Sequence, residues 1–104
     1  MLVLGMHRSG TSAVTRALAA LGLDLGGDPL MSATADNPTG HFEVGRLVGL
    51  DDQVLDALGG RWSAPPEAAP EVVAALAGTE LGDEARELID EVFADPNWVW
   101  KDPR

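Results

Sequence analysis

The sequence predicts an α/β fold in which a small parallel sheet is flanked by helices. A short apolar run at Leu2–Leu4 leads into a glycine-containing loop and then into a stretch with helical periodicity. A second apolar run, "WVWK" at 98–101, follows further helical stretches and a turn at 95–97. Strands that are joined through helices pair in parallel through right-handed crossovers, so these two runs are expected to lie in one sheet.

The elements follow from the hydrophobic periodicity and from glycine and proline breakers. The first helix is expected over 11–21, with Val14, Leu18 and Leu21 on one face and Gly22 at its end. The glycines and prolines of 23–45 predict an irregular segment with a short extended piece at 23–25. The other expected elements are helices over 46–58, 71–77 and 83–94 and a strand over 98–101.

Length and strand count bear on the domain organisation. With 104 residues, 45% of them hydrophobic, the chain has room for one small domain. Two strands alone rarely make a stable sheet, and parallel sheets normally contain several strands. We therefore expect further strands after Arg104 and interpret residues 1–104 as the N-terminal part of a single domain.

The composition excludes several classes of function. The net charge is −10, from 17 acidic and 7 basic residues, which argues against binding to nucleic acid or to an anionic membrane. There is no cysteine and the two histidines are far apart, so we expect neither a disulfide nor a metal site. No apolar run resembles a signal peptide or a membrane span, so a cytoplasmic protein is expected.

The stretch "GMHRSGTS" has the glycine spacing of a phosphate-binding loop. Gly5 and Gly10 are placed as in GxxxxGK[ST], but Thr11 stands where that pattern has lysine. Backbone N–H groups and a helix N-terminus would converge there on an anion, with Arg8 as the cation of the loop. Hydroxyl groups are supplied by Ser9, Thr11 and Ser12. The alternative is an ordinary turn between a strand and a helix.

This loop resembles the one that binds the 5′-phosphosulfate in sulfotransferases using 3′-phosphoadenosine 5′-phosphosulfate (PAPS). "HRSGTS" is similar to the family pattern [PR]-[KR]-S-G-T-[TS], and "DNPTGHFE" and "WVWKDPR" resemble two further landmarks of a bacterial branch, in the same order. The resemblance implies a P-loop-like sulfotransferase fold, of which 1–104 is the half that binds the 5′-phosphosulfate. The contacts to the 3′-phosphate would follow Arg104, so weak binding of PAPS by this chain is expected.

The resemblance also implies roles for individual residues. Arg8 would contact the oxygen that bridges to the sulfate, and Lys101 would help to hold the transferring sulfuryl group. The 5′-phosphate would be bound by Ser9, Gly10, Thr11 and Ser12. Glu43 is matched to the general base of carbohydrate sulfotransferases, with His41 as the alternative. "KDPR" lacks the histidine of the K-T-H pattern in cytosolic members, which moves the role of base to Glu43 or His41.

The implied reaction transfers a sulfuryl group from PAPS to the hydroxyl of a small-molecule or carbohydrate acceptor, without a required metal. Glu43 or His41 would take the proton of the acceptor, while Arg8 and Lys101 stabilise charge on the departing oxygen. Other interpretations stay open. Glu43 can be a helix-dipole partner, His41 a structural loop residue and Lys101 a surface residue.

Two other functions also fit the sequence. A nucleotide kinase or NTPase would need the missing lysine and a magnesium carboxylate, for which Asp102 is a weak candidate. A noncatalytic remnant is the other alternative, because only part of the site lies in this sequence.

Overall fold

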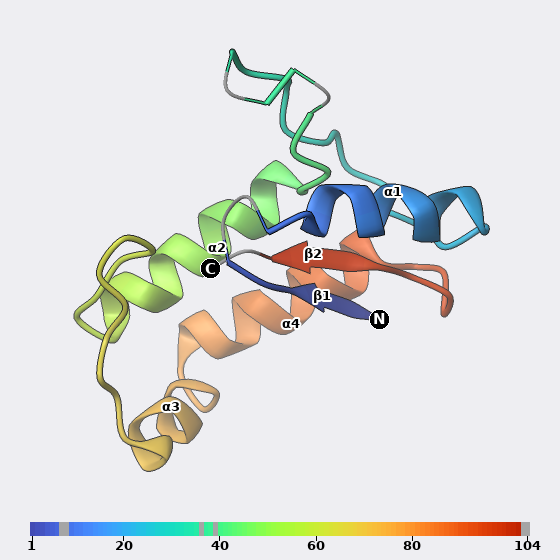
Figure 1. The fold of residues 1–104 in the computed structure, drawn as a ribbon. Coiled ribbons are helices and arrows are strands. Elements are labelled where there is room, and N and C mark those ends of the chain that lie inside the picture. The colour runs from blue at the N-terminus through green and yellow to red at the C-terminus, as the bar shows by residue number, and fades with distance from the viewer. Residues whose placement is uncertain (7–8, 36, 39, 103–104) are drawn as a thin grey trace.

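The computed structural model describes residues 1–6, 9–35, 37–38 and 40–102. In these ranges it contains four helices and two strands, arranged as shown in Figure 1. Their order is β1 (Leu2–Leu4), α1 (Thr11–Ala20), α2 (Gly45–Ala57), α3 (Pro70–Leu76), α4 (Glu80–Val92) and β2 (Trp100–Asp102). None of the helices in the described ranges has the length and apolar character needed to cross a membrane.

The strands pair in parallel, which confirms the α/β class. Val3 lies opposite Lys101, with Leu2 opposite Trp100. On the other edge of β2, the Asp24 N–H donates to the Asn97 carbonyl at 2.9 Å, and the Val99 N–H donates to the Asp24 carbonyl at 2.7 Å. The extended piece expected at 23–25 thus contributes one parallel bridge, between Asp24 and Trp98, and β2 lies between this bridge and β1.

The expected helices are confirmed, with shifted ends. The last of them, α4, begins at Glu80 rather than at 83 because Thr79 acts as its N-cap, accepting a hydrogen bond from the Gly82 N–H at 3.4 Å. The second strand covers Trp100–Asp102 rather than 98–101, because Trp98 and Val99 pair with Asp24 before the ladder to β1 begins.

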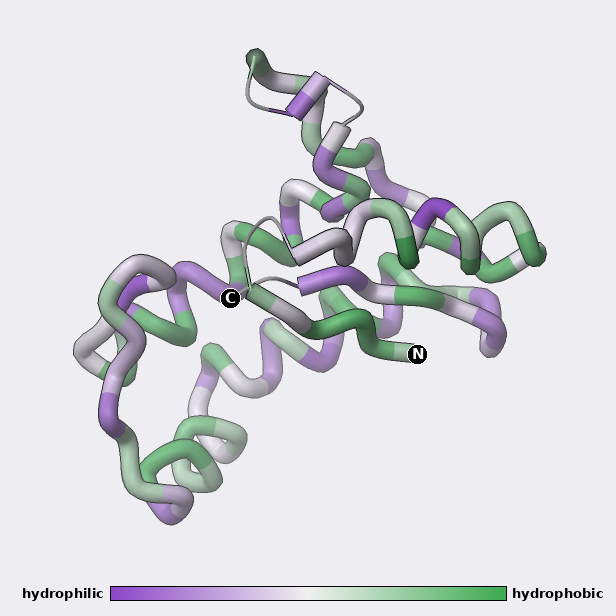
Figure 2. Tube along the Cα trace, in the orientation of Figure 1, coloured by the Kyte–Doolittle hydropathy of each residue, from purple (hydrophilic) through white to green (hydrophobic). Residues whose placement is uncertain are grey.

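The hydrophobic core lies between α2, α4 and β2. Its buried members are Val44, Leu47, Leu50, Val92 and Phe93. The Phe93 ring stacks on Trp98 at a centroid distance of 5.0 Å and lies 6.1 Å from Trp100, so the end of α4 is packed against β2. Hydrophobic and hydrophilic positions alternate along α4 (Figure 2), as expected for a helix with one face on the core.

The face of α1 that packs on the sheet differs from the expected one. Val14 and Leu21 are 52% and 79% exposed, whereas Thr11 and Thr15 are buried. One helical turn separates the two threonines, so they share a face, and the Thr15 hydroxyl donates to the Thr11 carbonyl at 2.9 Å. This hydrogen bond satisfies the buried hydroxyl and allows a polar face to pack inward.

Candidate functional site

The loop between β1 and α1 depends on two glycines. A Cβ on Gly5 would lie 2.8 Å from both Ser9 Oγ and Thr11 Cγ2, a distance that real Cβ contacts do not reach. Gly10 has φ 91°, in the left-handed region where a side chain is strained. Both described glycines of the loop thus stand where a side chain would be crowded or strained. His7 and Arg8 lie outside the described residues, so the structure does not place the predicted loop cation.

The loop leads directly into the N-terminus of α1. Gly10 is its N-cap and offers no side-chain oxygen to the first-turn N–H groups, and no acidic residue lies in that turn. These N–H groups carry the positive end of the helix dipole. Ser9 and Gly10 are exposed and Thr11 is buried. The Ser12 hydroxyl donates to the carbonyl of His41 at 3.3 Å, which joins the first turn of α1 to the segment before α2.

Glu43 and Lys101 form a buried ion pair. Lys101 Nζ donates to the Glu43 carboxylate across 58 residues of sequence, and the two side chains are only 5% and 4% exposed. Lys101 lies in β2 opposite Val3, and Glu43 lies just before α2. Lys101 is the middle residue of β2, so the pair lies one residue before the carboxyl end of that strand, and open parallel sheets bind their ligands at that edge. Figure 1 shows the starts of α1 and α2 at this end of β2.

The backbone around Glu43 is constrained. Phe42 has φ 56°, a conformation that costs a residue other than glycine roughly 1–3 kcal/mol and persists only where the surroundings enforce it. Hydrogen bonds hold it on both sides: the His41 carbonyl accepts from Ser12, and the Glu43 carbonyl accepts from the Met31 N–H at 2.7 Å. Segment 41–43 is thus held in one conformation, which aims the Glu43 carboxylate at Lys101.

The imidazole of His41 faces its own loop. Its Nε2 lies 3.0 Å from Thr34 Oγ1, and its Nδ1 lies 3.5 Å from Asn37 Nδ2. Because the amide nitrogen of Asn37 is a donor, Nδ1 accepts and Nε2 carries the proton that it donates to Thr34; this tautomer is assigned from the hydrogen-bond network. Both ring nitrogens therefore have partners within 34–41, an arrangement that suits a loop-holding residue.

The structure brings together most of the described residues that the sequence singled out. Ser12 reaches His41 and Lys101 reaches Glu43, so α1, β2 and the segment before α2 meet at one point. The direct pairing of Glu43 with Lys101 was not foreseen. A signal for it was present, since a lysine that ends the apolar run "WVWK" needs a carboxylate partner if it is buried.

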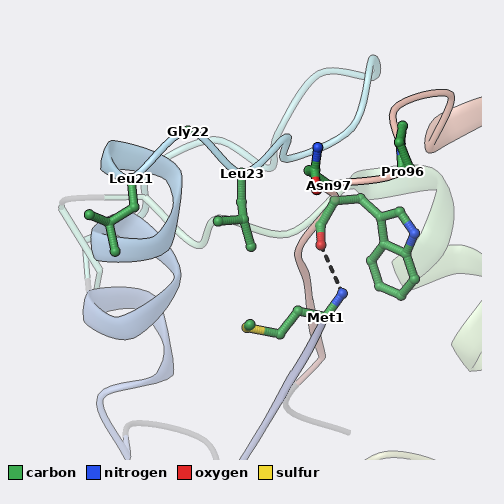
Figure 3. A pocket seen from close by; sticks show the side chains of 7 residues that line it. Met1, Leu21, Gly22, Leu23, Pro96 and Asn97 are labelled. Atoms are coloured by element: carbon green, nitrogen blue, oxygen red, sulfur yellow. Dashed lines mark hydrogen bonds between the residues drawn. The ribbon is translucent and has the colours of Figure 1, made fainter.

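A pocket of about 500 Å³ lies at the other end of the sheet (Figure 3). Met1, Leu23 and Trp98 are among its lining residues, and the backbone nitrogen of Met1 donates to the Trp98 carbonyl at 2.8 Å. Its lining contains no acidic or basic side chain. Because it lies at the amino ends of the strands and none of the described side chains that line it is acidic or basic, we do not regard it as the candidate site.

Comparison of the chain with models of protein families, with curated proteins and with solved structures gave no match.

Proposed function

We propose that this chain binds the phosphosulfate of PAPS at the loop between β1 and α1 and transfers its sulfuryl group to an acceptor hydroxyl. The observation that carries the proposal is the buried Glu43–Lys101 pair beside the uncapped N-terminus of α1. A carboxylate, an ammonium and a helix N-terminus without a side-chain cap thus lie near the carboxyl end of β2. The carboxylate suits proton removal, and the ammonium and the helix N-terminus suit the binding of an anion.

The residues present fit such a donor. First-turn N–H groups of α1 and the exposed Ser9 would contact the 5′-phosphate, and Lys101 Nζ would contact an oxygen of the sulfuryl group or the bridging oxygen. Arg8, which lies outside the described residues, is assigned to the bridging oxygen by the sequence resemblance alone. PAPS supplies an activated S–O bond whose cleavage leaves 3′-phosphoadenosine 5′-phosphate (PAP).

In the reaction, Glu43 takes the proton of the acceptor hydroxyl and the acceptor oxygen forms a bond to sulfur. The bond from sulfur to the bridging oxygen breaks, and its electron pair stays on PAP, where Lys101 offsets the new charge. The proton remains on the Glu43 carboxyl until it passes to solvent. We assign the base to Glu43 rather than to His41 because both nitrogens of His41 have partners in its own loop.

The test separates binding from chemistry. PAP binding is measured by calorimetry, and transfer of labelled sulfate from PAPS to a panel of alcohols and sugars is measured in parallel. Glu43→Gln should bind PAP at least as tightly as the wild type and should slow transfer by roughly 10² to 10⁴, the usual contribution of a general base. Arg8→Ala should weaken PAP binding roughly ten- to a hundredfold, the effect of losing a charged hydrogen bond.

Arg16→Ala is the matched control, because it removes the same charge from an exposed position further along α1. Equal effects of Arg8→Ala and Arg16→Ala would contradict a specific role of the loop. No saturable binding of PAP by the wild-type chain would overturn the proposal.

A nucleotide kinase remains the second candidate because Asp102 lies in β2 opposite Leu4, next to Lys101. Against it, Thr11 occupies the position of the required lysine, and its side chain is buried. Competition between PAP and ATP distinguishes the two. Displacement of bound PAP by ATP with magnesium, at lower concentration than by PAPS, would favour the kinase.

A further inference from the structure

Two of the polar contacts that hold segment 41–43 come from α1 and β2. Ser12 Oγ donates to the His41 carbonyl, and Lys101 Nζ donates to the Glu43 carboxylate. A third contact comes from the preceding loop, where the Met31 N–H donates to the Glu43 carbonyl. His41 and Glu43 are two residues apart, so their Cα atoms are separated by at most about 7 Å. The donors from α1 and β2 therefore act on one short segment, Ser12 on its backbone and Lys101 on the Glu43 side chain.

The same two donors belong to the proposed anion site. Ser12 is in the first turn of α1, and Lys101 is the middle residue of β2. A hydroxyl has a single proton to donate, so Ser12 cannot bond both the His41 carbonyl and a phosphate oxygen. Lys101 has three N–H groups but one positive charge, and that charge is balanced by Glu43 in the buried pair. An arriving anion competes with segment 41–43 at both points.

The backbone between the two contacts favours release. Phe42 is held at φ 56°, and the strain of this conformation is relieved when its neighbours are freed. A bound anion near Glu43 also adds like charge to the carboxylate in a buried setting, where such repulsion is poorly screened. The ligand therefore interacts more favourably with the protein when segment 41–43 is released than when it is held. A ligand can shift a conformational equilibrium only through such a difference.

We propose that segment 41–43 keeps Glu43 inaccessible until the donor anion binds and displaces the segment. Without an anion, Glu43 is held by Lys101 and is unavailable to the acceptor. The anion binds Lys101 and Ser12 in place of segment 41–43. The segment then moves away, and the Glu43 carboxylate becomes accessible as the base. This inference rests on the proposed function and adds an order to it, in which the donor binds before the acceptor can be activated.

The experiment measures how accessible the Glu43 carboxylate is. The wild-type chain is labelled with a carbodiimide and an amine while PAP is titrated, and the modification at each carboxylate is read by mass spectrometry. Glu43 should be protected without PAP and should react about tenfold faster or more at saturation, the ratio expected between a mostly closed and a mostly open segment. Glu91 is the internal control, because it is exposed, pairs with Arg46 and should react at a constant rate.

Ser12 variants test, without any ligand, whether the contact to His41 keeps Glu43 protected. Ser12→Ala removes one of the two contacts and should raise the labelling of Glu43 without PAP, whereas Ser12→Thr keeps the hydroxyl and should preserve protection. Saturable PAP binding in calorimetry with Glu43 still protected would overturn this inference and leave the proposed function standing. Absence of PAP binding would overturn both.

Discussion

The two strands lie side by side in one sheet, yet their residues are buried to very different degrees. Val3 and its partner Lys101 are both buried, but Leu2 and Leu4 of β1 are 53% and 65% exposed, whereas Trp100 and Asp102, which lie opposite them in β2, are only partly exposed. The difference follows from the helices: Phe93 at the end of α4 packs on Trp98 and Trp100, and the core lies on that side. Burial on this face is decided by the covering helix and not by hydrophobicity, since Asp102 is less exposed than the leucine opposite it.

The candidate site lies at the border between the two regions. Lys101 belongs to the well-packed strand, and the glycine loop begins at the end of the exposed one. A buried pair on the packed side can hold its geometry, while the loop side stays open to a ligand. The following predictions test this contrast, beginning with the largest expected effect.

The largest loss of stability should come from breaking the buried pair. Lys101→Met removes the ammonium from the buried Glu43 carboxylate, and we expect the free energy of unfolding to fall by about 3–5 kcal/mol, measured by urea denaturation. The double variant Lys101→Met/Glu43→Leu should recover most of this loss, because no charge is then buried. A loss below about 1 kcal/mol for Lys101→Met would show that the carboxylate reaches solvent easily.

A matched pair of leucines tests the contrast directly. Leu47→Ala removes a fully buried side chain from the core between α2 and α4 and should cost about 2–5 kcal/mol. Leu4→Ala makes the same chemical change in β1, where the side chain is exposed, and should change stability by no more than about 0.5 kcal/mol. Thermal denaturation of both variants gives the comparison, and equal losses would mean that the outer side of β1 is covered in solution.

A smaller effect is expected at the start of α4. Thr79 accepts a hydrogen bond from the Gly82 N–H, so Thr79→Ala should lower the free energy of unfolding by about 1 kcal/mol. Thr79→Ser keeps the hydroxyl oxygen and should retain most of the stability. Chemical denaturation of both variants decides whether the cap is needed, and an unchanged midpoint for Thr79→Ala would contradict its role.

The smallest effect concerns the surface ion pairs of Arg46. Its guanidinium contacts Glu91 at 2.8 Å and Asp28 at 3.1 Å, and joins the start of α2 to α4. Hydrogen bonding to Arg46, aided by its charge, lowers the pKa of the Glu91 carboxyl, and the same contact raises the pKa of Arg46. A carboxyl whose pKa is lowered by folding adds stability above its unfolded pKa, about 4.3, and loses it as the pH falls through the folded value.

Melting temperatures of wild type and Glu91→Gln should therefore differ slightly at pH 7, and the difference should vanish in acid below the folded pKa of Glu91. Added salt should also reduce it, because both partners are exposed. Glu87→Gln, at an exposed position on the same helix, is the control. A difference that persists in acid and in high salt would assign the effect to packing.

Local sequence signals predicted most of the fold. The helices and both strands were expected within a few residues of their observed bounds, because turn residues and hydrophobic periodicity act over one or two helical turns. The predicted inward face of α1 was wrong for Val14 and Leu21, which are exposed, while Leu18 is partly buried and Thr11 and Thr15 pack on the sheet. Periodicity marks a face that is able to be buried, but only the neighbouring element decides which face is covered.

For the site, the sequence indicated the residue types and not their partners. Glu43, His41 and Lys101 were singled out, but the ring of His41 turned to Thr34 and Asn37, and Glu43 turned to Lys101. The choice between the two bases depended on these contacts. No spacing rule could supply them, because Glu43 and Lys101 are separated by 58 residues.

The amino-acid sequence by itself determined the glycine loop, since Gly5 and Gly10 are the residues that permit its close contacts and its left-handed backbone. It also determined which segments became helix or strand, because those preferences are local. The tertiary structure alone decided that a lysine in β2 and a glutamate before α2 meet in a buried pair, with Phe42 constrained beside them. Such a pair exists only where packed elements exclude water, and its geometry is a property of the assembled fold.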